Sequence, residues 1–280
     1  MLARPILLCA SSLSRSNLSS SSTGISGIGR ELVLQLIEAG ASVVVIDQNA
    51  AKGAELVGSL QQIHFIQADM ADPVEAEKSF EEIKTHYASI DYVFNNAGIF
   101  MGGEIRDTPL KNWKPVVDNN IWAVANGTHF AYQAMLKQGY GHIVNVASAT
   151  GIFPVPGMGI YGSSKYAIVG LGSVLRVEAK KLGIKVSTAC PTIVDTPLYD
   201  TATYNGVDVK RAMKARTTFQ TPDVTARRIL KRVRKNKAII HTANSTLFAW
   251  IGFRLSPSLY MLSAQKVISV YRKKLRKIKK

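Results

Sequence analysis

Short apolar runs alternate along this chain with longer stretches in which apolar residues recur at helical spacing. The runs ASVVVID, IHFIQAD and GHIVNVAS have the length of buried strands, and an amphipathic helical pattern follows each of them. A strand, a helix and a second strand in succession form a parallel βαβ unit. We therefore predict an α/β fold with one doubly wound parallel sheet and helices on both of its faces.

Composition agrees with a single large domain and shows where the charge lies. The 280 residues are enough to bury a substantial core, and the two cysteines, Cys9 and Cys190, make no disulfide framework. No metal-binding pattern is present, so we expect no metal. The formal net charge is +16, yet no Asp or Glu follows Asp223. The excess positive charge therefore belongs to the C-terminal part of an otherwise neutral chain.

A tyrosine and a lysine stand one helical turn apart, at Tyr161 and Lys165, and Ser148 precedes them. A lysine ammonium on the same helix face favours phenolate and lowers the tyrosine pKa toward neutral pH. Such a phenol can exchange a proton with an alcohol or carbonyl oxygen, which a serine hydroxyl can hold in place. A YxxxK pair alone occurs by chance, so its weight depends on the neighbouring motifs.

Those neighbours follow a fixed order: TGISGIG, ASVVVID, QADM, YVFNNAG, DNNIWAV, HIVNVAS, YGSSK and CPTIVDTP. From about Thr23 to Thr196 this order resembles the classical short-chain dehydrogenase/reductase family. The resemblance implies a Rossmann-type sheet and an oxidoreductase that interconverts a secondary alcohol and a carbonyl with NAD or NADP. It implies that Tyr161 is the acid–base and that Lys165 also contacts the nicotinamide ribose. It further implies that Ser148 positions the substrate oxygen and that Asn120 supports a proton relay.

The same resemblance predicts the cofactor site. In the glycine turn, missing side chains would let backbone amides approach a pyrophosphate at a helix N-terminus. Asp47 ends a predicted strand and is followed by Gln48, which favours NAD over NADP because a carboxylate repels a 2′-phosphate. Asn95 is expected to be more structural than chemical. The predicted cofactor-binding residues are Gly24, Gly27, Ile28, Gly29, Asp47, Asp69, Met70, Asn96, Ala97, Gly98, Tyr161, Lys165, Pro191, Val194 and Thr196.

The start of the chain departs from the family pattern. The glycine turn has the spacing G-x-x-G-x-G instead of G-x-x-x-G-x-G, and SNLSSSS precedes it where a buried strand belongs. Three explanations compete. The run PILLCA could be the first strand with residues 11–22 looping out, the start could be misjoined, or, ranked lower, it could be a transit-like mitochondrial segment. We predict that PILLCA fills the slot of the first strand.

The chain accordingly divides into an atypical segment (residues 1–22), an oxidoreductase domain (23–245) and a basic extension (246–280). In the extension, Val267, Val270, Tyr271, Leu275 and Ile278 recur at helical spacing among basic residues. Such a helix could lie on an anionic membrane or pack on the enzyme with a solvated basic end. Nucleic-acid binding is ranked lower, because no recognised module accompanies the charge.

We predict a cytoplasmic oxidoreductase for a small hydrophobic or lipid-like alcohol or ketone, in a pocket closed by residues 197–220 and by the region from Phe153 to Met158. Peripheral membrane contact through the tail is a further expectation, and the family resemblance implies a homo-oligomer. The alternative function is a catalytically inactive, membrane-associated scaffold of the same fold.

Overall fold

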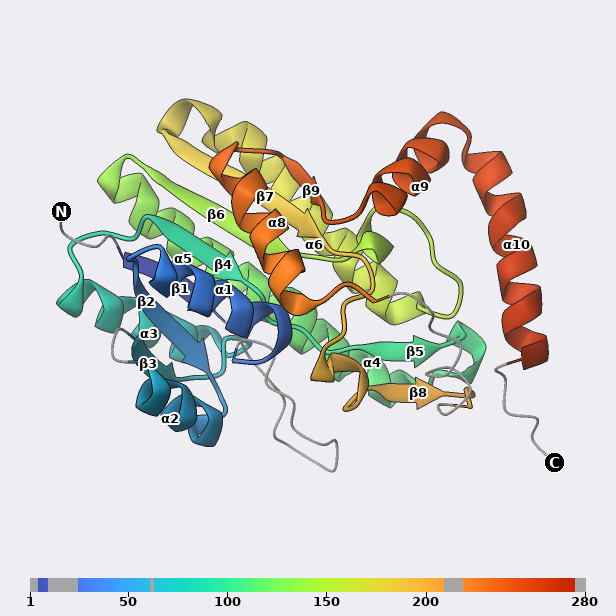
Figure 1. Cartoon of the computed structure of the whole chain (residues 1–280), viewed down its shortest axis with the longest axis horizontal. Coiled ribbons are helices and arrows are strands. Elements are labelled where there is room, and N and C mark those ends of the chain that lie inside the picture. The colour runs from blue at the N-terminus through green and yellow to red at the C-terminus, as the bar shows by residue number, and fades with distance from the viewer. Residues whose placement is uncertain (1–4, 10–24, 61–62, 209–218, 275–280) are drawn as a thin grey trace.

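The main sheet is parallel and contains seven strands within the part of the chain that the structure describes (Figure 1). The structure is a computed structural model, and it describes residues 5–9, 25–60, 63–208 and 219–274. The strand order is β3-β2-β1-β4-β6-β7-β9. The strands are β1 (Pro5–Cys9), β2 (Ser42–Asp47), β3 (Ile63–Gln67), β4 (Tyr92–Asn95), β6 (Gly141–Val146), β7 (Ile184–Cys190) and β9 (Ile239–His241). The predicted α/β fold is confirmed.

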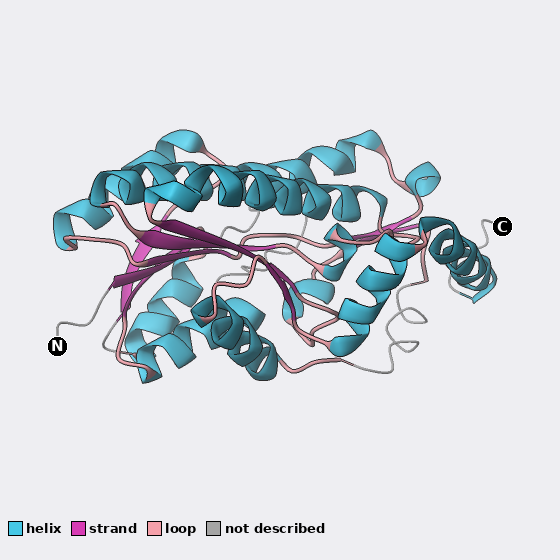
Figure 2. Cartoon of the chain, turned by 90° about the horizontal axis from the view of Figure 1, so that it is seen from above, coloured by secondary structure: helices cyan, strands magenta, loops and turns pink. Residues whose placement is uncertain are grey.

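Helices form a layer on each face of this sheet (Figure 2). On β2, Val43 and Val45 pack with one layer, whereas Val44 and Ile46 pack with the other, because successive side chains of a strand point to opposite faces. The first layer consists of α1 (Gly27–Glu38), α2 (Ala50–Ser59) and α8 (Pro222–Arg234). The second consists of α3 (Pro73–His86), α5 (Ala123–Gln138) and α6 (Gly159–Glu178).

The predicted first strand lies in the centre of the sheet. Strand β1 pairs in parallel with β2 on one side and with β4 on the other, which confirms that PILLC fills the slot of the first strand. Pro5 is the first residue of β1, a position where a strand tolerates proline. The predicted loop of residues 11–22 lies outside the described residues.

Two regions differ from what their sequence patterns alone indicate. The pattern of residues 112–138 indicates one long helical region, but the structure divides it into α4 (Trp113–Val117), a π-helical turn (Asp118–Trp122) and α5. The sequence TPLYDTATYNG, residues 196–206, indicates an irregular loop, but it contains β8 (Thr203–Asn205), which pairs in parallel with β5 (Met101–Gly103). Three-residue strands are too short to show a two-residue period, so their pairing is visible only in the fold.

The basic extension forms two helices, α9 (Asn244–Leu255) and α10 (Pro257–Lys274). Helix α10 begins at a proline, a residue favoured at the first helical position, and starts well before Val267, where the helical pattern was predicted. The predicted helix is confirmed as far as Lys274, and residues 275–280 lie outside the described residues. No helix in the described ranges is both long enough and apolar enough to cross a bilayer.

A buried histidine in the sheet couples folding to pH. His142 on β6 is only 3% exposed, and its Nε2 lies 2.8 Å from Oγ of Ser187 on β7. The Ser187 hydroxyl donates to the carbonyl of Lys237, so its oxygen is left to accept from Nε2–H of His142. Burial, with smaller effects of Lys185 and Arg176, lowers the pKa of His142 to about 3.

We expect the protein to lose stability in mild acid because of His142. The folded-state pKa lies below the unfolded value, so below about pH 6.5 the unfolded chain binds one more proton, and stability falls as pH falls. The loss is about 1.4 kcal/mol per pH unit between pH 6.5 and the folded-state pKa. Denaturant unfolding at pH 7 and pH 5 measures it. His142→Gln should make the free energy of unfolding less dependent on pH. His129→Gln, at an exposed position, is the control and should leave that dependence unchanged. Equal pH dependence in the parent and both variants would contradict the assignment.

Candidate active site

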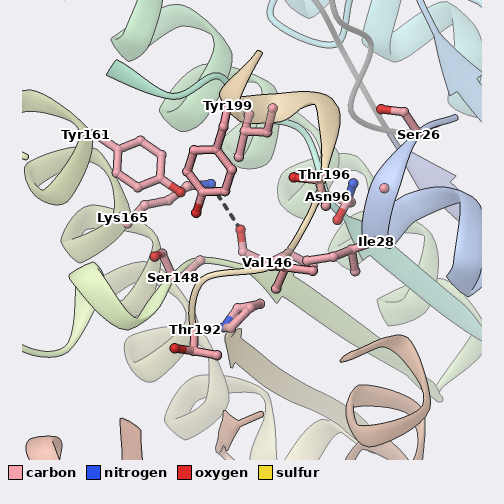
Figure 3. A pocket seen from close by; sticks show the side chains of 16 residues that line it. Ser26, Ile28, Asn96, Val146, Ser148, Tyr161, Lys165, Thr192, Thr196 and Tyr199 are labelled. Atoms are coloured by element: carbon pink, nitrogen blue, oxygen red, sulfur yellow. Dashed lines mark hydrogen bonds between the residues drawn. The ribbon is translucent and has the colours of Figure 1, made fainter. Parts of the chain in front are cut away.

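A pocket lies at the carboxyl ends of the central strands, beside the N-terminus of α1 (Figure 3). From β1 the chain continues to β2 and β3 on one side, and from β4 it continues to β6 and β7 on the other. This reversal of direction is where open α/β sheets bind ligands. The pocket is lined by Ser26, Gly27, Ile28, Asn96, Gly98, Val146, Ala147, Ser148, Tyr161, Lys165, Pro191, Thr192, Val194, Thr196, Leu198 and Tyr199.

The structure brings Ser148, Tyr161 and Lys165 to this one pocket, as the sequence predicted (Figure 3). Tyr161 and Lys165 lie on α6 and are 7% and 4% exposed. The Lys165 ammonium is 5.8 Å from the centroid of the Tyr161 ring and donates to the carbonyl of Val146 at 3.2 Å. Ser148 follows β6, and its hydroxyl accepts from the amide of Thr150 at 3.2 Å. A phenol, an ammonium and a hydroxyl therefore surround one space.

Burial sets the acidity of both groups on α6. It raises the pKa of Tyr161 above the usual range, Tyr199 adds to this, and the hydrogen bond with Ser148 opposes it. That direction is opposite to the lowering expected from the YxxxK spacing, because helical spacing carries no information about burial. Burial also lowers the pKa of Lys165 to about 8. The lysine therefore remains largely charged at neutral pH.

Asn120 is buried in the π-helical turn behind Lys165 and does not line the pocket. Its amide donates to the carbonyl of Ile99 at 3.1 Å and to Oγ of Ser164 at 2.9 Å, and its oxygen accepts from the amide of Ile99 at 2.7 Å. Ser164 in turn donates to the carbonyl of Tyr161. Asn120 therefore ties the turn after β4 to the helix that carries Tyr161. π-Turns are frequent at functional sites.

Gly98 leaves room for the Lys165 ammonium. A Cβ at position 98 would lie 2.9 Å from Nζ of Lys165 and 3.1 Å from Oδ1 of Asn120. A methyl group there would displace the ammonium, since the Asn120 amide is held by its own hydrogen bonds. The residue type at position 98 is therefore set by a contact between segments far apart in the sequence.

We expect Gly98→Ala to reduce activity at least about tenfold, because a displaced ammonium no longer faces Tyr161. Gly58→Ala is the matched control, since a Cβ on Gly58 in α2 would meet nothing within 4 Å. The control should be neutral or stabilising by up to about 1 kcal/mol. Steady-state kinetics and thermal unfolding check both variants. Full activity in Gly98→Ala would show that the position of Lys165 is unimportant.

The glycine turn is seen in part. Gly27 opens α1 with φ of +52°, and a Cβ there would lie 2.7 Å from Cγ2 of Thr196. The close approach of these two segments leaves no space for a side chain at position 27, which explains why a glycine stands there. It also places Gly27 and Thr196 on one wall of the pocket. Gly24 lies outside the described residues. Gly29 is buried within α1 and does not line the pocket, so its contact with a cofactor stays a prediction.

Four further residues of the predicted cofactor site do not line this pocket. Asp47 ends β2 and Asp69 follows β3, and their carboxylates accept from the amides of Asn49 and Ala71 at 2.9 Å and 2.8 Å. Burial raises the pKa of Asp69. Met70 and Ala97 are buried in the core beneath α3 and α5. The structure thus does not place these four residues on the pocket wall.

Asn95 has the structural position that was expected. Its amide donates to Oδ1 of Asn145 at 2.8 Å and to Oγ1 of Thr128 at 3.1 Å, which ties β4 to β6 and α5.

Cys190, at the end of β7, is fully buried, and burial raises the pKa of its thiol to about 12. Like Asn95, it packs beneath the site.

The family model of the short chain dehydrogenases matches residues 22–205, well over half of the chain. The protein belongs to the short-chain dehydrogenase family. An uncharacterized oxidoreductase of Staphylococcus epidermidis is 30% identical over 62% of this chain and 76% of its own length. The 15-hydroxyprostaglandin dehydrogenase [NAD(+)] of Mus musculus is 29% identical over 62% of this chain and 66% of its own length.

Solved structures of other short-chain dehydrogenases share the fold. One from Burkholderia phymatum in complex with NAD has a TM-score of 0.77 at 21% identity and covers 91% of this chain and 95% of its own. One from Sphingobium yanoikuyae in complex with NADPH has a TM-score of 0.73 at 20% identity and covers 94% of this chain and 95% of its own. At such identities the likeness shows the fold alone. The chain therefore belongs to a family of oxidoreductases and has a dinucleotide-binding fold.

In this short-chain dehydrogenase an aromatic wall adjoins Tyr161, and the sequence did not predict it. The Phe100 ring lies 4.8 Å from that of Tyr161, 5.1 Å from that of Tyr199 and 5.8 Å from that of Tyr204. Phe100 precedes β5 and Tyr204 lies on β8. The parallel pairing of β5 with β8 therefore brings these two rings together. The sequence feature that could have indicated this contact is the pair of tyrosines, Tyr199 and Tyr204, in an otherwise irregular segment.

The region from Phe153 to Met158 does not line the pocket, contrary to expectation. Phe153 packs in the core cluster beside α9 and α10, and the carbonyl of Pro154 accepts from the Tyr260 hydroxyl at 3.0 Å. The C-terminal helices cover this loop because its apolar side chains turn toward them. Of the predicted closing segment 197–220, Leu198 and Tyr199 line the pocket, and residues 209–218 lie outside the described residues.

Proposed function

We propose that the protein is an NAD-dependent oxidoreductase that interconverts a secondary alcohol and a carbonyl on a hydrophobic substrate. The observation that carries the proposal is the meeting of Ser148, Tyr161 and Lys165 in one pocket at the reversal point of the sheet. Ser148 follows β6, and Tyr161 and Lys165 lie on α6. Their chemistry is that of a hydrogen-bond donor, an acid–base and the electrostatic support of that acid–base.

The residues present fit a nicotinamide dinucleotide. The pocket opens at the N-terminus of α1, where backbone amides favour a negatively charged pyrophosphate. Gly27 and Gly98 both line the cavity, and a Cβ on either would clash with Thr196 or Lys165, so only glycine fits at these positions. Residues 26–28, Asn96, Gly98, Val194 and Thr196 would hold the cofactor. When bound, it would supply the hydride acceptor or donor.

The chain's own residues would handle the proton. The Tyr161 oxygen takes the proton from the substrate hydroxyl during oxidation and returns it during reduction. Because burial opposes the phenolate, an opposing positive charge is needed, and Lys165 provides it within the same pocket. The Ser148 hydroxyl would position the substrate oxygen. Asn120 acts as a positioning residue through Ile99 and Ser164.

Two further observations support the choice of NAD over NADP and a hydrophobic class of substrate. Asp47 ends β2 and no basic residue follows it directly, which supports NAD. Tyr199 lines the pocket beside Tyr161, and the buried Phe100 ring packs against both of these rings and that of Tyr204, which suits an apolar substrate body. The mouse relative named 15-hydroxyprostaglandin dehydrogenase [NAD(+)] is consistent with both.

The test is a fluorescence titration with NADH and NADPH, followed by reduction of NAD by a panel of secondary alcohols of increasing chain length. We expect NADH to bind more tightly and the rate to rise with the apolar length of the alcohol. An alternative, a catalytically inactive scaffold, is suggested by the shortened glycine turn. The absence of cofactor binding would support the scaffold and reject the enzyme.

We expect the protein to form a homo-oligomer through the exposed face of α6. Tyr166, Val174 and Val177 are 39%, 58% and 76% exposed and share one side of this helix. Burying them against a second copy would remove apolar surface from water. Sedimentation velocity measures the oligomeric state, and Val174→Glu should shift the equilibrium toward monomer. A monomeric parent protein would contradict the expectation.

A further inference from the structure

Helices α9 and α10 form an arm at one side of the molecule, outside the main sheet and its two helical layers (Figures 1 and 2). The side of the arm turned away from the protein carries a row of exposed apolar side chains, and we call this row the outer face. Its side chains are between 39% and 82% exposed and recur at helical spacing. The outer face consists of Phe248, Ile251, Leu255, Leu259, Leu262 and Val270.

The opposite side of the arm packs on the protein. Trp250, Phe253 and Tyr260 contact the core cluster that contains Phe153, and the rings of Phe253 and Tyr260 are 5.3 Å apart. Ala264 on α10 is 8% exposed. The arm therefore has one buried and one exposed apolar side. A helix that only covers the enzyme needs the buried side alone.

Two polar contacts hold α10 in place along its length. The Tyr260 hydroxyl donates to the carbonyl of Pro154 at 3.0 Å near the start of the helix. Near its end, the Arg272 guanidinium donates to both oxygens of Glu104, to Oε2 at 2.8 Å and to Oε1 at 3.2 Å. Glu104 is 8% exposed, and these hydrogen bonds lower the pKa of its carboxyl. The exposed apolar side chains are thus carried on a fixed scaffold.

Every charged side chain on α9 and α10 is basic. Arg254, Lys266 and Lys273 are exposed on the same two helices, and the sequence contains no Asp or Glu after Asp223. Two copies of this surface placed face to face would repel each other. A nucleic acid would neutralise the positive charge, but it would leave the exposed apolar side chains in contact with water. An anionic lipid surface satisfies both, because its headgroups attract cations and its acyl region accepts apolar side chains.

We propose that the outer face of α9 and α10 docks the protein on an anionic lipid bilayer. The helices lie in the plane of the interface, with Phe248, Leu255 and Leu259 inserted below the headgroups and the lysine and arginine side chains reaching the phosphates. Docking through this face needs no cofactor and no turnover. The proposal therefore stands or falls independently of the oxidoreductase function.

The test uses the full chain with vesicles of phosphatidylcholine alone and of phosphatidylcholine mixed with phosphatidylserine. Four outer-face side chains are replaced together, and all four are exposed, so the fold is expected to survive. The variant carries Phe248→Ser, Leu255→Ser, Leu259→Ser and Leu262→Ser. We expect the parent to bind the mixed vesicles in preference, less so at high salt, and the variant to bind at least about tenfold more weakly.

A matched control removes the same number of exposed apolar side chains from other parts of the surface. These are between 41% and 79% exposed. The control carries Val57→Ser, Val74→Ser, Leu110→Ser and Leu182→Ser. It should bind vesicles as the parent does, and thermal unfolding should show all three proteins folded.

Three outcomes would overturn the proposal. The parent could fail to bind mixed vesicles, or the control could lose binding as much as the outer-face variant. Alternatively, the outer-face variant could keep its vesicle binding and change only its sedimentation coefficient, which would make the outer face a contact between copies of the chain.

Discussion

Replacing Tyr161 by Phe is expected to lower turnover by a factor of about 10² to 10⁴, the range that a positioned acid–base contributes. The substitution removes one oxygen and keeps the ring, so the contact with Phe100 at 4.8 Å survives. The affinity for NADH should change little, because only the group that exchanges the proton is lost. Stopped-flow kinetics and a binding titration separate the two quantities.

Tyr166→Phe is the control for this experiment. Tyr166 lies on the same helix and does not line the pocket, so its phenol plays no part in the proposed chemistry. Its variant should retain the activity of the parent. If Tyr161→Phe kept near-normal turnover while Tyr166→Phe lost it, the acid–base assignment would be wrong.

Removing the carboxylate at position 47 is expected to change the choice of cofactor. The parent should bind NADH about a hundredfold more tightly than NADPH, because a carboxylate repels the 2′-phosphate and loses its hydrogen bonds to the ribose. Asp47→Ser should narrow that gap to less than about tenfold. Since Asp47 also accepts from the amide of Asn49 at 2.9 Å, the variant is checked for folding by its melting temperature.

Glu55→Ser serves as the control for charge removal. Glu55 is exposed on α2, the helix that follows β2, and its loss should leave the ratio of the two affinities unchanged. Equal binding of NADH and NADPH by the parent protein would reject the role of Asp47.

Several features of the fold could be predicted from the sequence because they depend on neighbouring residues. The alternation of strand-length runs and amphipathic stretches determined the parallel sheet, and the run PILLCA was apolar enough to be recognised as its missing strand. The four-residue spacing placed Tyr161 and Lys165 on one helix face, and the chain order brought Ser148 to the same strand edge. Hydrogen bonding and side-chain periodicity within one element are local properties, so a single sequence reveals them.

Only the tertiary structure decided the remaining features of the site. The aromatic wall requires β5 and β8 to pair across about a hundred residues of chain, and the contact of Gly27 with Thr196 joins two segments that lie still farther apart in the sequence. The pKa of Tyr161 rises where spacing predicted a fall, because burial depends on everything packed around the phenol. Contacts between distant segments and desolvation are properties of the packed molecule, and no local pattern in the sequence encodes them.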